Sequence, residues 1–152
     1  MAVDLTVVFT SAQPGGFTTA VQPPSPSSGS VTTYAVEAYP LDDAWVARTA
    51  IDIQAHCAVH SEYLLVFHGA SAAQAPHLGF AMRAARRRIS GYVLIDPQLP
   101  TPGAVSDWPD APVTVVLTHD VEPGLASAAT LRGWTVRRGD ATAAIREIID
   151  RP

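Results

Sequence analysis

The chain has 152 residues and a mass of 16.0 kDa, the size of a single domain with one hydrophobic core. Hydrophobic residues make up 47% of the chain and charged residues 16%, a composition that excludes an intrinsically disordered protein. The net charge of −4 excludes nucleic acid as the main partner, and the single cysteine excludes an internal disulfide and a multi-cysteine zinc site.

The N-terminal residues and the basic residues exclude further classes of protein and of site. The first ten residues have no basic region and only a short apolar run, so we expect no signal peptide, no membrane span and a cytoplasmic location. All ten positive charges are arginines, which excludes a Schiff-base lysine and a phosphate-loop lysine. The spacing of histidines and acids indicates no metal site, and we expect no cofactor.

Short apolar runs alternate with helical patterns along the chain. In chain order we expect strands at 5–9 and 31–38, a helix at 42–58, a strand at 63–67, a helix at 72–88, strands at 92–95 and 113–117, a helix at 125–132, a strand at 134–136 and a helix at 141–149. Unbroken apolar strands between helices are typical of parallel sheets covered on both faces. The sequence therefore predicts one α/β domain over residues 1–152, a three-layer sandwich around a mostly parallel sheet of about six strands.

Two proline-rich segments interrupt this alternation. Residues 22–30 are rich in proline and serine, and we expect a flexible surface loop there. Residues 97–112 contain five prolines, which predicts an irregular link between two strands rather than a helix.

Polar residues and glycines gather where the predicted strands end. In parallel sheets, ligands bind outside the carboxyl ends of the strands, so these segments are the candidate site. The predicted ligand-binding residues are those of the two glycine-containing turns: Ser11, Ala12, Gln13, Gly15, Gly16, Gly69 and Ala70.

The order of the parts resembles the α/β-hydrolase fold, and in particular its thioesterase branch. The strand 63–67 with the following His68-Gly69-Ala70-Ser71 and an alanine-rich helix is similar to the strand, elbow and helix that carry the nucleophile in that family. The segments 89–97 and 110–120 resemble the next two strands, which lead to an acidic triad member. The loop 11–16 falls where the family has its oxyanion loop.

The chain also departs from the family pattern at the positions that carry its chemistry. In register, Phe67 replaces the first elbow glycine, Gly69 takes the nucleophile's place and Ser71 takes the place of the last glycine. The link 97–112 stands where the family inserts a lid. No histidine follows His119, so the general base is absent from its usual place. The resemblance therefore implies a lidless homologue with a degenerate triad.

Five residues remain candidates for catalysis: His68, Ser71, Asp96, His119 and Asp120. Some of the predicted site residues also have a purely structural interpretation. Ser71 is either a helix N-cap or an unorthodox nucleophile, His68 either a hydrogen-bonded strand end or a catalyst, and Gly69 either a tight turn with positive φ or a ligand contact. Asp96 and Asp120 follow two different strands, and members of the family carry the triad acid after either of them. His119 can exchange protons near neutral pH.

Three functions follow from these residues. The first is a protein that binds an acyl or polyketide-like ligand, or another small apolar ligand, or catalyses a non-hydrolytic step on it. The second is a hydrolase with a displaced triad of Ser71 or Ser11, His68 or His119, and Asp96 or Asp120. The third is a non-catalytic interaction subunit, which fits a homo-oligomer.

Two further expectations depend on other segments. The run 86–88 of three arginines suits a solvated helix end, or a patch for an acidic carrier protein. An alternative fold is a flavodoxin-like sheet, which shows a similar alternation and would use the loop 11–16 to bind an anion.

Overall fold

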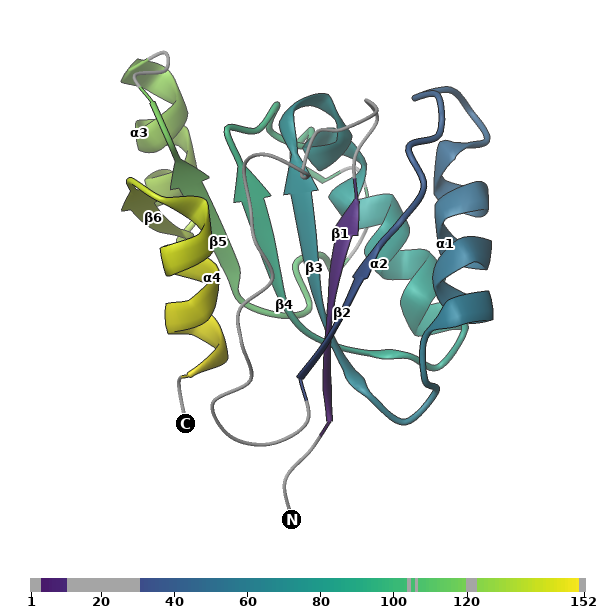
Figure 1. Ribbon diagram of the computed structural model, residues 1–152. Helices are drawn as coiled ribbons and strands as arrows, with labels where there is room; N and C mark the ends of the chain where they lie inside the picture. Colours follow the sequence, from purple (N-terminus) through teal and green to yellow (C-terminus); the bar gives the residue numbers. More distant parts are fainter. Residues whose placement is uncertain (1–3, 11–30, 104, 106, 120–122, 151–152) are drawn as a thin grey trace.

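The computed structural model describes residues 4–10, 31–103, 105, 107–119 and 123–150. These residues form one six-stranded sheet in the order β2-β1-β3-β4-β5-β6, and every neighbouring pair is parallel (Figure 1). The strands are β1 Leu5–Thr10, β2 Val31–Ala35, β3 Glu62–His68, β4 Arg88–Ile95, β5 Val113–Leu117 and β6 Thr135–Arg138. The helices are α1 Trp45–His56, the 3₁₀ helix η1 Gly69–Gln74, α2 Ala75–Ala84, α3 Pro123–Leu131 and α4 Ala141–Ile149.

The strand order places the start of the chain inside the sheet. β1 lies between β2 and β3. The chain passes from β1 to β2 on one side and then crosses back past β1 to β3 on the other, and ligands of such sheets bind where the strand order reverses in this way. The predicted three-layer sandwich with a parallel sheet is confirmed. The order also contains the order 2-1-3-4-5 that flavodoxin-like sheets have, so the strand order alone does not exclude that alternative.

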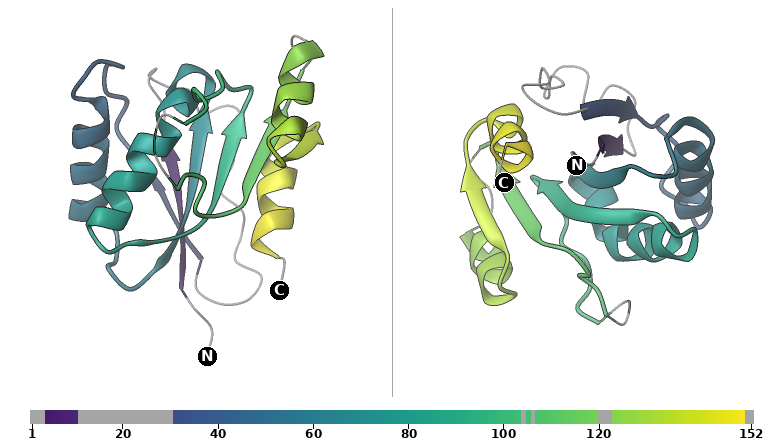
Figure 2. Two further views of the ribbon diagram at one scale, coloured as in Figure 1. Left: turned by 180° about the vertical axis from the view of Figure 1, so that it is seen from behind. Right: turned by 90° about the horizontal axis from the view of Figure 1, so that it is seen from below.

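The two faces of the sheet carry separate cores. Successive residues of a strand point to opposite faces, so Leu65 and Phe67 of β3 pack toward α1, α2 and α3, while Leu64 and Val66 pack toward α4. All four are buried. Figure 2 shows the same division, with α1, α2 and α3 on one side of the sheet and α4 on the other. Because both faces are covered, the central strands are mostly apolar, and the predicted run 63–67 is apolar at every position.

The helix expected at 72–88 is wrong at both ends. The segment 69–74 is a 3₁₀ helix, α2 ends at Ala84, and Arg88 already belongs to β4. Arg87 is therefore not part of a solvated helix end. Its guanidinium is buried and donates hydrogen bonds to the Tyr63 hydroxyl (2.6 Å) and the Cys57 carbonyl (3.0 Å). Arg87 is unavailable to an acidic partner because its charge is engaged inside the fold.

The helix expected at 42–58 is shorter than predicted, because α1 begins at Trp45 and ends at His56. Asp42 does not cap it directly. Its carboxylate instead accepts a hydrogen bond of 2.9 Å from the backbone N–H of Ala44, the residue before the helix. The strand expected at 31–38 likewise ends at Ala35, whereas the strand expected at 92–95 begins earlier, at Arg88.

The link between β4 and β5 contains no helix or strand among its described residues, as its prolines predict. It includes a cis peptide bond between Trp108 and Pro109. No helix in the described part of the chain has both the length and the hydropathy needed to cross a membrane.

Candidate functional site

The ends of β3, β4 and β5 are joined to one another by hydrogen bonds. The Gly69 carbonyl, just after β3, accepts a hydrogen bond of 3.0 Å from the N–H of Gln98, which follows β4. The N–H of Asp96 donates to the Val116 carbonyl of β5 at 2.9 Å. The candidate residues that follow these strands therefore lie along one edge of the sheet, which we call the carboxyl edge.

Asp96 is held in an unusual backbone conformation at this edge. Its φ is +42°, a left-handed value that aspartate tolerates better than most residues because its short side chain bonds to nearby backbone. Here the carboxylate accepts a hydrogen bond of 2.9 Å from the Thr118 N–H and a second one from the Thr118 hydroxyl. These two bonds fix the orientation of the carboxylate across the β4–β5 gap.

His119 completes a small cluster with Asp96 and Thr118. Its Nδ1 lies 3.4 Å from Oδ2 of Asp96 and 3.2 Å from Oγ1 of Thr118. The His119 side chain is 67% exposed, whereas that of Asp96 is 10% exposed. A histidine oriented through Nδ1 by a carboxylate, with the rest of the ring open to solvent, can take up and release a proton at Nε2.

Gly69 begins the turn from β3 into η1. Its φ is +62°, which confirms the predicted turn with positive φ and explains the glycine there. Apart from its two chain neighbours, no described residue has an atom within 4 Å of a Cβ added at Gly69. The described residues therefore leave space for a side chain at this position, where the chain has none. Ala70 follows in η1 and is exposed.

Ser71 is fully buried and its hydroxyl is engaged locally. The hydroxyl donates to the His68 carbonyl at 2.9 Å and accepts from the His68 N–H at 3.3 Å. Ser71 is the third residue of η1 and His68 is its N-cap, so the predicted N-cap role of Ser71 is wrong; its hydroxyl instead belongs to a capping box that closes the first turn of η1. The structure thus brings the backbone of His68 to Ser71, and separately brings Asp96 to His119.

Some predicted residues lie outside the described part of the chain. Ser11, Ala12, Gln13, Gly15, Gly16 and Asp120 belong to this group. Sequence reasoning also missed Thr118, the residue that orients Asp96. Its position between strand β5 and His119 was visible, but only the cross-strand hydrogen bonds show its role.

A second cluster, around Asp52 of α1, was not predicted. The buried Asp52 carboxylate accepts hydrogen bonds from the Tyr34 hydroxyl, the Tyr39 hydroxyl (3.2 Å) and the Glu37 N–H (3.2 Å). His56 places Nδ1 2.9 Å from the same carboxylate, and its ring stacks on that of Tyr34 with centroids 5.3 Å apart. The spacing of an aspartate and a histidine four residues apart on the predicted helix was the available signal.

The environment of this cluster changes the pKa values of its members. Burial opposes ionisation of Asp52, but the hydrogen bonds from Tyr34, the Glu37 N–H and Tyr39, together with His56, outweigh it and lower the pKa of the carboxyl. Burial and the adjacent Asp52 carboxylate raise the pKa of Tyr34. The cluster thus holds an ionised aspartate against neutral tyrosines.

Within the described residues, no three histidine, cysteine, aspartate or glutamate side chains gather in a way that could hold a metal ion. Comparisons with protein-family models, with curated proteins and with solved structures found no match.

Proposed function

We propose that this protein binds an acyl ligand, or a similar small apolar carbonyl compound, at the carboxyl edge of the sheet and does not cleave it through a serine. The observation that carries this proposal is the turn at Gly69. It follows a buried strand, precedes a helix and has positive φ, and the described residues beyond its chain neighbours leave the space around its missing Cβ open. A strand–turn–helix of this kind presents a nucleophile in hydrolases, and here it presents none.

Ser71 supports the same interpretation by its burial. A serine nucleophile needs a hydroxyl that reaches the substrate and a base within hydrogen-bonding distance. The Ser71 hydroxyl is instead inaccessible and bonded to the His68 backbone. For Ser71 to act as the nucleophile of a displaced triad, the first turn of η1 would have to open and expose its hydroxyl.

Asp96 and His119 supply the chemistry that remains. With Nδ1 oriented by Asp96 and Thr118, His119 can remove a proton from a bound ligand at Nε2 and return it elsewhere. This suits a proton transfer or a cyclisation, in which no water is added to the acyl group. A phosphopantetheine-type arm of a carrier protein is one source of such an acyl group.

A fluorophosphonate probe, followed by intact mass, tests the absence of a serine nucleophile. We expect no adduct on the wild-type chain. We expect the Gly69→Ser variant to gain an adduct on residue 69, and to lose it again when His119→Ala is added, because the new hydroxyl then lacks a base. A stoichiometric adduct on Ser71 of the wild-type chain would instead establish the displaced-triad hydrolase.

Binding is tested with the octanoyl thioester of N-acetylcysteamine, with the acetyl thioester as the less apolar control. Backbone amide shifts are expected at Gly69 and His119, and none at Glu62, which begins β3 at the opposite edge. Release of octanoate by the wild-type chain, or shifts confined to other surfaces, would refute the proposal.

A non-catalytic interaction subunit is the second candidate, and one surface feature favours it. Phe80 of α2 is 58% exposed and lies between two surface hollows of about 560 and 530 Å³. Asp42 and Asp43 border the first hollow and Asp107 the second. If this surface joins two copies, sedimentation should show a dimer that Phe80→Ser dissociates, and a wild-type monomer at high concentration would rule out the homo-oligomer.

A further inference from the structure

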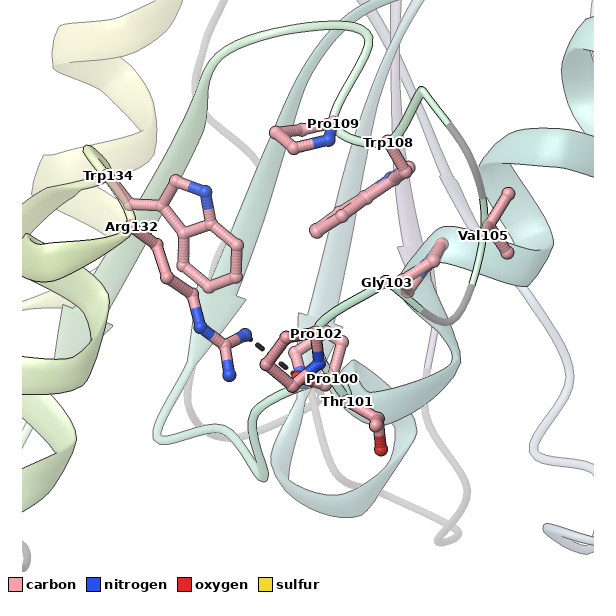
Figure 3. A pocket seen from close by; sticks show the side chains of 10 residues that line it. Pro100, Thr101, Pro102, Gly103, Val105, Trp108, Pro109, Arg132 and Trp134 are labelled. Atoms are coloured by element: carbon pink, nitrogen blue, oxygen red, sulfur yellow. Dashed lines mark hydrogen bonds between the residues drawn. The ribbon is translucent and has the colours of Figure 1, made fainter.

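The link between β4 and β5 borders a cavity on the sheet face that α1, α2 and α3 cover. Its volume is about 180 Å³ (Figure 3). Its walls come from the link, from the start of α2 and from the turn between α3 and β6. They include Pro100, Pro102, Trp108, Pro109, Arg132 and Trp134. None of Gly69, Asp96 and His119 lines it. The cavity is therefore separate from the carboxyl edge and from the function proposed there.

Two tryptophans form rigid apolar walls of this cavity. The Trp108 and Trp134 rings meet edge to face, with centroids 5.6 Å apart and planes at 87°, and Figure 3 shows the two rings pointing toward each other at the cavity. The prolines add further apolar surface with no conformational freedom to lose. Such walls fit a flat ring or a short branched chain.

The packing behind Trp108 holds that wall in place. The Trp108 ring meets the edge of Tyr92, with centroids 5.2 Å apart, and the Tyr92 hydroxyl donates to Asp110 at 2.7 Å. A Cβ on Gly79 of α2 would lie 2.2 Å from that hydroxyl, so only glycine allows the helix to approach this closely. The wall is thus built before any ligand arrives.

Arg132 places a positive charge beside the apolar walls. Its guanidinium carbon lies 5.0 Å from the centre of the Trp134 ring, and Nη1 donates to the Pro100 carbonyl at 2.8 Å. That bond positions the guanidinium but uses only one of its five donors. No acidic side chain is among the described residues that line the cavity, so the charge there has no carboxylate from the wall itself.

We propose that this cavity binds a small carboxylic acid that carries one apolar ring or short branched group. The ring lies against Trp108 and Trp134, and the carboxylate bonds to Arg132. The volume limits the ligand, because pockets for drug-sized molecules measure about 300–1,000 Å³. A guanidinium favours a carboxylate over a neutral amide, since its parallel N–H groups match the two carboxylate oxygens.

The test compares phenylacetate with phenylacetamide, which has the same ring but no charge. Binding is followed by the indole N–H signals of the three tryptophans, and Trp45, the buried first residue of α1 and absent from the cavity, serves as the internal reference. We expect saturable shifts of Trp108 and Trp134, and an affinity for the acid about tenfold above that for the amide. Equal affinities, or shifts of Trp45 alone, would overturn the proposal.

Variants identify the charge that is responsible. Arg132→Gln should lower the affinity for phenylacetate about tenfold and leave that for phenylacetamide unchanged. The affinity of Arg132→Lys for phenylacetate should lie between those of the wild type and Arg132→Gln, because lysine keeps the charge but loses the paired donors. Arg146→Gln, on the exposed side of α4 beyond the opposite face, is the matched control and should change nothing.

The same measurement separates this proposal from the function assigned to the carboxyl edge. Phenylacetate binding should persist in His119→Ala, whereas the response to the octanoyl thioester should not. If Arg132→Gln does not fold, the comparison of acid and amide on the wild-type chain still decides the outcome. A preference for phenylacetate that survives in folded Arg132→Gln would overturn the assignment.

Discussion

Two aspartate–histidine pairs occupy different parts of the same fold and have different surroundings. Asp52 and His56 pack beside the edge strand β2, where the carboxylate is also bonded to two tyrosines and a backbone N–H. Asp96 and His119 lie at the carboxyl edge, where Thr118 is the one further partner of the carboxylate among the described residues. The first pair anchors several elements of the fold, whereas the second is the pair to which we assign ligand chemistry in the proposed function. The distance between the two side chains does not distinguish the roles.

Removal of the charge at each aspartate gives the largest expected contrast. Asp52→Asn should lower the free energy of unfolding by about 3 kcal/mol, because buried donors lose their ionised acceptor. Asp96→Asn should cost about 1 kcal/mol, since asparagine tolerates positive φ and still accepts from the Thr118 N–H. Urea unfolding measures both, with Asp43→Asn at an exposed position as the control. Equal losses at the two sites would break the comparison.

The acid side of the stability profile should depend on Asp52. Its pKa is lower in the folded than in the unfolded chain, so its contribution is present above the unfolded pKa and is lost as pH falls through the folded pKa. The gap in stability between wild type and Asp52→Asn should therefore narrow as pH falls from about 5 to about 2. Thermal unfolding at several pH values measures the gap, and a constant gap would contradict the ionised cluster.

The alkaline side should depend on Tyr34 of the same cluster. Its pKa is raised in the folded chain, so stability is complete below the unfolded value of 10.0 and falls as pH rises above it. One such group contributes a slope of at most about 1.4 kcal/mol per pH unit. Tyr34→Phe should flatten this limb in part, because burial and Asp110 also raise the pKa of Tyr92. If the wild type and Tyr34→Phe lose stability identically above about pH 10, the contribution of Tyr34 is refuted.

The histidines give the smallest effect on stability and the sharpest difference in function. His119→Ala should change the free energy of unfolding by less than about 0.5 kcal/mol, because the side chain is largely exposed. His56→Ala should cost about 1 kcal/mol or less, through its lost bond to Asp52 and its lost stacking on Tyr34. Only His119→Ala should abolish the response to the octanoyl thioester. The reverse result would exchange the roles of the two pairs.

Local patterns were sufficient for most of the sheet and for the Gly69 turn. The run 63–67 is apolar at every position and 113–117 at all but Thr114, and this predicts strands buried on both faces in a parallel sheet. Gly69 follows the first of these runs after His68, and glycine there predicted a turn with positive φ. The helix boundaries were less certain, because alanine-rich residues 72–88 carry no local signal that separates η1, α2 and the start of β4.

The sequence by itself determined which residues form the strands and that polar groups gather at their ends, because both follow from side-chain period and from breaker residues close in the chain. Only the tertiary structure decided which of those groups meet. Thr118 orients Asp96 across two strands, Arg87 is drawn into the interior by Tyr63, and Arg132 reaches the carbonyl of Pro100. These contacts join residues far apart in the chain, and their partners are set by strand order and helix packing, which no local pattern encodes.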